Sequence, residues 1–274
     1  MCDIWEKKPD RREELGLETI ARILRSKCAG GLRHIGLTGG EPFLREDLAG
    51  IYSLARRLHP DCRITISSNG TLPDAMAGFF SGIDDPEKIC LEWSLPGLPA
   101  HDVKARFPAL QMKAKFVITP WNFEEIGPVA RYCAERGLPL LLKLIENVKS
   151  YTNSLRHGEN LRDRSFVFSP GQRRRILSLL KDTDVARIAE RAPLDGVVSS
   201  LSDERLRRRC LVPARSLFVN SDGTVYRCRN HEPIGNARSQ DLDALRSDDQ
   251  DPGSLPDGTT DICGACSAFA RFLT

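Results

Sequence analysis

The sequence RHIGLTGGEPFLRED, residues 33–47, joins a short apolar run to a loop with two adjacent glycines, and this stretch decides the fold. The run RHIGLT is typical of a β-strand. Gly39 and Gly40 let backbone N–H and C=O groups approach a ligand closely, and Pro42 stiffens the turn that follows. Taken alone, these residues could also form a plain βα turn with a capping acidic residue. The surrounding sequence has to distinguish such a turn from a ligand-binding loop.

Helix-periodic segments alternate with short apolar segments on both sides of this stretch, from about residue 17 to residue 139. Amphipathic helices are predicted over residues 17–28, 48–58 and 123–137, the last closed by Gly137. Strands are predicted over residues 33–38, 63–68, 88–95, 113–119 and 139–145. Repeated βα units favour an α/β fold with a parallel sheet, arranged as an open or partial barrel whose functional loops lie at the carboxyl ends of the strands.

The character of the chain changes after about residue 192. Before this point, SPGQRRRILSLLKD (169–182) predicts a helix capped by Ser169. After it, RSLFVNSDGTVYRC (215–228) predicts a hairpin that turns at Asp222-Gly223, and a stretch rich in Pro, Gly and Asp leads to the closing CGAC (263–266). We therefore expect two domains, residues 1–192 and residues 193–274, the second small and of the α+β type.

Composition and charge are those of an ordinary globular protein. The 274 residues are 41% hydrophobic and 28% charged, and the net charge of +3 is too small to indicate a nucleic-acid partner. No stretch approaches the roughly 20 uninterrupted apolar residues of a membrane helix, and the first residues lack the apolar run of a signal peptide. We expect a cytoplasmic protein with no membrane or nucleic-acid partner.

The nine cysteines favour metal ligation over disulfides, because their number is odd and the expected compartment is reducing. Four of them lie singly in apolar or helical stretches and are interpreted as buried thiols: Cys28, Cys62, Cys90 and Cys133. The last four cysteines of the chain form the series Cys210-x17-Cys228-x34-Cys263-x2-Cys266, and we call them the late cysteines. Four thiolates suit either a [4Fe–4S] cluster or tetrahedral zinc, and spacing alone does not separate the two.

The segments MCDIW (1–5), GGEP (39–42), SSNG (67–70) and SLPGLPAHD (94–102) together resemble the radical S-adenosylmethionine (SAM) superfamily. In that family a loop after the first strand carries three cysteines spaced C-x3-C-x2-C, and the third is often followed by acidic and aromatic residues. Cys2 stands 37 positions before Gly39, as the third family cysteine would. Pro96 departs from the pattern, because the family usually has Asp there.

The resemblance implies a partial (β/α)6 barrel without its first strand. It implies a [4Fe–4S] cluster held by three thiolates, with one iron left open to chelate SAM, which yields a 5′-deoxyadenosyl radical on reductive cleavage. The residues of the GGEP motif would contact the methionyl amino group, and three polar residues would lie near the ribose or the carboxylate of SAM. These cofactor-binding residues are Gly39, Gly40, Glu41 and Pro42, with Ser68, Asn69 and Ser94.

Cys2 is the one member of the cysteine trio in this sequence, and a single thiolate cannot hold a four-iron cluster. Cys28, predicted on the following helix, is not at a spacing that could substitute for the other two. We therefore expect that the chain as written cannot complete its SAM cluster. A start codon placed too late is the expected explanation, and a degenerate or truncated enzyme is the second.

The late cysteines, with IGN at 234–236, resemble the shortened auxiliary-cluster module called twitch, of the larger SPASM group. This implies Cys210, Cys228, Cys263 and Cys266 as ligands of an auxiliary [4Fe–4S] cluster that accepts or relays an electron. The expected activity is radical oxidation or modification of a small metabolite or peptide, most similar to alcohol-oxidising aminoglycoside-pathway dehydrogenases. Flavodoxin or ferredoxin would be the low-potential electron donor.

One alternative for the function remains open at this point. A non-catalytic remnant or binding protein would hold structural zinc in its C-terminal cysteines instead of a cluster. Weaker site candidates are His101-Asp102 as an acid–base pair, and Lys149 and Tyr151 as part of a substrate pocket. The basic run of residues 173–175 is interpreted as a solvated helix face.

Overall fold

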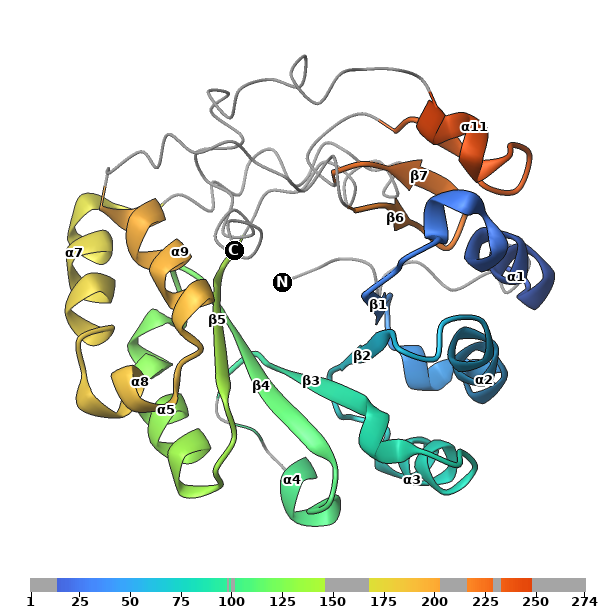
Figure 1. Ribbon diagram of the computed structural model, residues 1–274. Helices are drawn as coiled ribbons and strands as arrows, with labels where there is room; N and C mark the ends of the chain where they lie inside the picture. The colour runs from blue at the N-terminus through green and yellow to red at the C-terminus, as the bar shows by residue number, and fades with distance from the viewer. Residues whose placement is uncertain are drawn as a thin grey trace. The chain divides into compact units, whose positions relative to one another are not determined.

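The computed structural model describes residues 14–97, 99, 102–145, 168–202, 216–228 and 233–247 (Figure 1). These residues form two compact units. One contains the described residues up to Leu91 and those from 216 onward, and the other runs from Glu92 to residue 202. Among the described residues, no helix is long and apolar enough to cross a membrane.

The five predicted strands are all present, and they hydrogen-bond in the order β1-β2-β3-β4-β5. Their bounds are His34–Leu37 (β1), Arg63–Ser68 (β2), Ile89–Leu95 (β3), Gln111–Ile118 (β4) and Leu140–Leu144 (β5). Strands β1 and β2 are parallel, as are β4 and β5. Sequential order with helical crossovers is the arrangement of a partial βα barrel, so the predicted fold class is confirmed. Strand β3 contributes residues to both units.

The first unit carries its helices beside β1 and β2 (Figure 1). They are α1 (Leu17–Arg25), α2 (Leu48–Leu58) and α3 (Pro73–Ser81), with the short 3-10 turns η3 (Lys27–Ala29), η4 (Pro42–Leu44) and η5 (Pro86–Lys88). Helix α2 has the predicted bounds. Its Tyr52 is 2% exposed and donates a 2.6 Å hydrogen bond to the Asp85 carboxylate, which also accepts from Arg56 at 3.0 Å. These contacts attach α2 to the segment that leads into β3.

The second unit places helices over one face of β4 and β5. They are α4 (Val103–Arg106), α5 (Ile126–Glu135), α7 (Pro170–Leu179), α8 (Thr183–Ile188) and α9 (Arg191–Leu201), with the turn η6 (Phe123–Glu125). Gly137 ends the α5 segment with φ of 61°, and Ser169 forms a capping box with Gln172 at the start of α7, both as predicted. The expected domain boundary at residue 192 falls within α9, which contacts β5 and α7. The boundary stays a prediction.

The C-terminal part of the first unit is a three-stranded antiparallel sheet, β6 (Phe218–Val219), β7 (Thr224–Tyr226) and β8 (Gly235–Asn236), followed by α11 (Leu242–Ser247). The predicted hairpin is confirmed. Gly223 has φ of 87°, a conformation that glycine adopts without strain. The small core of this part consists of Val225, Ala237, Leu242 and Leu245.

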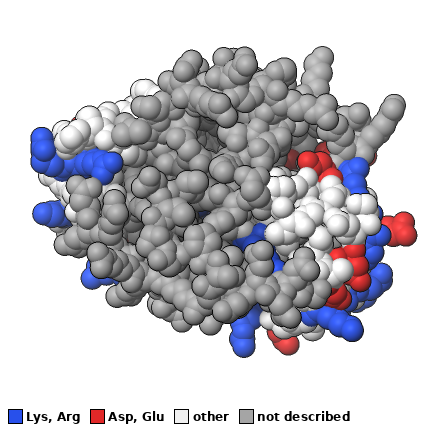
Figure 2. Space-filling view, turned by 90° about the horizontal axis from the view of Figure 1, so that it is seen from above, with Lys and Arg blue, Asp and Glu red and all other residues white. Residues whose placement is uncertain are grey.

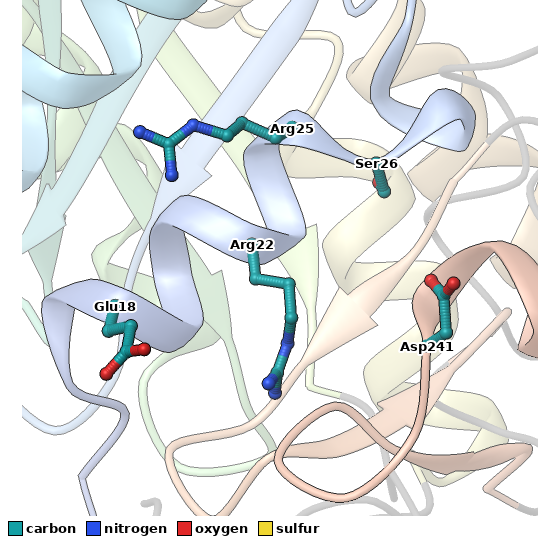
Figure 3. A pocket seen from close by; sticks show the side chains of 5 residues that line it. All are labelled: Glu18, Arg22, Arg25, Ser26 and Asp241. Carbon is teal, nitrogen blue, oxygen red and sulfur yellow. The ribbon is translucent and has the colours of Figure 1, made fainter.

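Helix α1 is attached to this C-terminal part of the same unit (Figure 1). Ile23 and Cys28 pack against its small core, and the Asp243 carboxylate accepts hydrogen bonds from the backbone N–H groups of Lys27 at 2.9 Å and Cys28 at 2.8 Å. Arg22 donates to the carbonyls of Ala237 and Arg238. An open pocket of about 350 Å³ lies alongside, and Figure 3 shows Arg22 pointing toward the segment before α11 while Arg25 points away from it.

Cys28 corrects one sequence-based expectation. It was predicted on the helix of residues 17–28 and as a buried thiol. Helix α1 ends at Arg25 instead, and Cys28 lies half-buried in η3, because the N–H groups of this turn bond to Asp243 rather than to the preceding helical turn. Cys62, Cys90 and Cys133 are buried, as expected.

Candidate functional site

The GGEP loop begins directly after β1, and the side chain of Glu41 attaches it to the loop after β2. Glu41 Oε1 accepts a 2.9 Å hydrogen bond from the Ser68 hydroxyl, and Oε2 accepts one of the same length from the backbone N–H of Asn69. Ser68 Oγ in turn accepts from the N–H of Gly70 at 3.0 Å. Two loops that follow neighbouring parallel strands are thereby held together at the carboxyl ends of those strands.

Gly39 and Gly40 present open backbone at this edge. Both are exposed, and within the described part of the chain their N–H and C=O groups have no hydrogen-bond partner. A Cβ built on Gly39 would meet no atom within 4 Å. A ligand with an ammonium or carboxylate group can therefore reach backbone acceptors and donors here, which fits the amino-acid end of SAM.

Pro42 and Asn69 shape the two loops at this edge, Pro42 in the loop of the open glycines and Asn69 in the loop after β2. Pro42 is buried at the first position of η4, whose Phe43 N–H donates to Glu41 Oε1 at 3.3 Å. The Asn69 carbonyl oxygen Oδ1 accepts from the N–H and hydroxyl of Thr71 at 2.8 and 2.7 Å. Its Nδ2 group makes no hydrogen bond to the residues that the structure describes, so it remains available as a donor.

Ser94 and Asp102 belong to the second unit and have different surroundings. Ser94 lies one residue before the end of β3, half-buried, and its hydroxyl has no partner among the described residues. Asp102 caps α4 by accepting from the N–H of Ala105 at 3.0 Å, and it forms an ion pair with Arg136. Burial raises the pKa of Asp102, but the hydrogen bonds from Arg136 and Ala105 more than offset this, so the pKa lies below its ordinary value. This carboxylate is engaged in structural contacts. His101 lies outside the described residues.

Most of the predicted cluster ligands lie outside the described residues: Cys2, Cys210, Cys263 and Cys266. Cys228 is described and half-buried, two residues beyond the end of β7. Among residues 14–97, 102–145 and the later described ranges, no group of three or more His, Cys, Asp or Glu side chains is arranged to hold a metal ion. Lys149 and Tyr151 also fall outside the described ranges.

A family model for the radical SAM superfamily matches residues 1–145, more than half of the chain, including both loops joined by Glu41. The chain belongs to the radical SAM superfamily. A second model, the SPASM iron–sulfur cluster-binding domain, matches residues 210–267, a range that holds all four late cysteines. The chain therefore combines a radical SAM domain with an auxiliary-cluster domain, and the cofactors of these domains are SAM and [4Fe–4S] clusters.

Curated relatives share a short segment with this radical SAM protein. GTP 3',8-cyclases of Stenotrophomonas maltophilia strains K279a and R551-3 are each 41% identical over 58 residues, which cover 21% of this chain and 18% of the relative. The matched segment thus spans less than a fifth of the length of these curated relatives. Their activity does not carry over from so short a match.

Two solved structures with bound S-adenosylmethionine (AdoMet) share the fold over nearly the whole chain. Streptococcus suis SuiB bound to S-adenosylmethionine aligns with a TM-score of 0.59 and 17% identity, covering 92% of this chain and 65% of that one. A histidine-tagged anSMEcpe with bound AdoMet aligns with a TM-score of 0.59 and 16% identity, covering 94% of this chain and 76% of that one. At these identities the likeness shows the fold alone.

Charged side chains of both signs lie close together on part of the described surface. Seen from above, Lys and Arg lie beside Asp and Glu on the right-hand side (Figure 2). In the basic run of residues 173–175, Arg175 is half-exposed and forms a two-pronged pair with Glu124, with its nearest contact at 2.9 Å. This agrees with the interpretation of that run as a solvated helix face.

Proposed function

We propose that the enzyme cleaves SAM reductively to a 5′-deoxyadenosyl radical and uses it to oxidise or modify a small metabolite or a peptide, with the auxiliary cluster as electron acceptor. The observation that carries the proposal is the pair of loops joined by Glu41, which exposes the backbone of Gly39 and Gly40 at the carboxyl ends of β1 and β2. A low-potential flavodoxin or ferredoxin would supply the electron.

The proposed roles of the site residues follow from their contacts. Gly39, Gly40 and the backbone of Glu41 bind the methionyl amino group, since the open carbonyls of Gly39 and Gly40 and the second lone pair of the Glu41 carbonyl, which also accepts from the Leu44 N–H, are the acceptors that an ammonium group requires. Pro42 and Ser68 are positioning residues: Pro42 is buried in η4, and the buried Ser68 hydroxyl donates to Glu41. Two further polar groups, the Asn69 side-chain amide and the Ser94 hydroxyl, bind the ribose or the carboxylate.

In this proposal the GGEP loop works by close backbone approach. A methyl group at residue 39 would point into open space in the structure, so Gly39→Ala leaves packing intact while narrowing the approach of a ligand to the loop. Gly78→Ala is a matched control, because Gly78 is exposed on α3 and a Cβ there also meets no atom within 4 Å.

The test measures 5′-deoxyadenosine formed from SAM with dithionite under anaerobic conditions. It uses this chain and a version extended upstream to supply the cysteine pair that the family pattern requires. Gly39→Ala is expected to lower the rate and the affinity for SAM at unchanged thermal stability, and Gly78→Ala is expected to behave as the parent. Wild-type activity in Gly39→Ala would contradict the proposed SAM site, and no 5′-deoxyadenosine in any version would contradict the proposed function.

A further inference from the structure

The face of strands β3, β4 and β5 that is turned away from helix α5 carries a row of charged and polar side chains among the described residues. In β4 the buried residues Ala114 and Phe116 alternate with the half-buried Lys115. Helix α5 contacts β4, and Trp93 of β3 meets Tyr132 of α5 at a ring-centroid distance of 6.3 Å. Because neighbouring residues of a strand point to opposite faces, the residues that flank these buried ones lie on the face turned away from the helices.

The strand register and one ion pair place three charged side chains on that face. Lys115 is paired in register with Leu141, so Lys143, two residues further along β5, lies on the same face. Glu92 joins them, because its carboxylate lies 3.4 Å from the Lys115 ammonium. Ser94, two residues beyond Glu92, also shares this face. We call Glu92, Lys115 and Lys143 the charged row.

The charged row has one positive charge in excess. The side chains of Glu92 and Lys115 are 13% and 17% exposed, and they neutralise each other. Lys113 on the same face forms an ion pair with Glu190. Lys143 is half-buried and has no ion pair or hydrogen bond of its side chain within the described ranges. A partly desolvated ammonium without a counter-ion is costly, so an anion at this position would offset that cost.

Lys143 is also positioned where a substrate would bind. It precedes the last residue of β5, as Ser94 precedes the last residue of β3, and both therefore lie at the carboxyl ends of parallel strands. In βα barrels this end of the strands carries the binding and catalytic groups. A compact ammonium group is suited to phosphate or carboxylate.

We propose that Lys143, on the same sheet face as the Glu92–Lys115 pair, forms a subsite for an anionic group of the substrate, either a carboxylate or a phosphate. This inference rests on the proposed function, because it assumes that a substrate enters the barrel. It points away from a polycationic substrate of the aminoglycoside type, which the excess positive charge would repel. An acidic peptide side chain, a small organic acid or a phosphorylated metabolite would satisfy it.

The test uses the full chain with its lysines dimethylated by ¹³C-formaldehyde, and follows the methyl resonances by NMR during titration with glutarate and with inorganic phosphate. The Lys143 resonance is assigned by its loss in Lys143→Arg. Lys181 is the control, since it is exposed and outside the charged row. We expect a saturable shift at Lys143 with either probe, stronger with the one that matches the substrate, and no saturable shift at Lys181.

Two variants and one competing ligand complete the test. Both variants lack the Lys143 resonance, so their binding of the probe is measured by isothermal titration calorimetry beside the parent. Lys143→Gln should weaken binding of the probe roughly tenfold or more, since one charge-assisted contact is lost, and Lys143→Arg should retain it. Equal shifts at Lys143 and Lys181, or none at Lys143, would overturn the proposal. So would displacement of the probe by SAM, which would assign Lys143 to the cofactor carboxylate. No cluster is required, so failure here is distinguishable from failure of SAM cleavage.

Discussion

The bridge between the two site loops predicts a graded response when Glu41 is changed. In Glu41→Ala the N–H of Asn69 and the hydroxyl of Ser68 both lose their 2.9 Å acceptors. Hydrogen bonds to a charged group contribute about 1.5–3 kcal/mol each, and we take about 2 kcal/mol in total because Asn69 is exposed and water replaces part of the loss. Glu41→Gln keeps one acceptor oxygen, so we expect about half of that effect.

Amide hydrogen exchange at Asn69 measures this bridge directly in the full chain. A loss of about 2 kcal/mol corresponds to exchange roughly 30-fold faster in Glu41→Ala, and about fivefold faster in Glu41→Gln. The Gly70 amide should follow, because its acceptor is the Ser68 hydroxyl that Glu41 holds. Glu87→Gln is the control, since Glu87 is exposed and makes no hydrogen bond to the described residues through its side chain. Exchange at Asn69 in Glu41→Ala within about twofold of the parent would refute the bridge.

Three further outcomes are expected. Backbone N–H groups of Lys27 and Cys28 hold the pKa of Asp243 below its ordinary value. The parent should therefore be more stable than Asp243→Asn in urea unfolding at neutral pH. This difference in stability should be complete above about pH 4, the ordinary pKa of an aspartate, and should be lost as the pH falls through the lowered pKa of Asp243 in the folded protein. Burial raises the pKa of the Cys133 thiol to about 12, so iodoacetamide at pH 8 should leave it unmodified until the protein unfolds, as mass spectrometry would show. Gly223→Ala should lower the melting temperature, because φ of 87° strains alanine and its Cβ would lie 2.6 Å from Asn236.

The sequence was sufficient where local pattern determines structure. In strand β2 the buried Ile64 and Ile66 alternate with polar residues, and α2 has a repeating apolar stripe, so the positions of both elements follow from periodicity. Helix α9 was not predicted, because its segment RAPLDGVVSSL contains Pro and Gly and weak helix formers; packing against β5 stabilises it instead.

Long-range contacts explain what the sequence could not show in the site. The GGEP and SSNG motifs were recognisable, but the bond from Glu41 to Asn69 spans 28 positions and leaves no local signal. The hydrogen bond from the Cys28 N–H to Asp243 spans 215 positions, so the early end of α1 at Arg25 also leaves no local signal. The charged row appears only when the register of β4 and β5 is known. The proposed roles of the cysteines outside the described residues still rest on their spacing and on the family match.

The most direct test of the central claim is the metal content of the anaerobically reconstituted chain, measured as iron, acid-labile sulfide and zinc, beside the double variant Cys263→Ala/Cys266→Ala. We predict at least about four irons and four sulfides per chain in the parent, and loss of about four of each in the variant. Iron and sulfide unchanged in the variant, or zinc without sulfide in the parent, would contradict an auxiliary iron–sulfur cluster at the C-terminal cysteines.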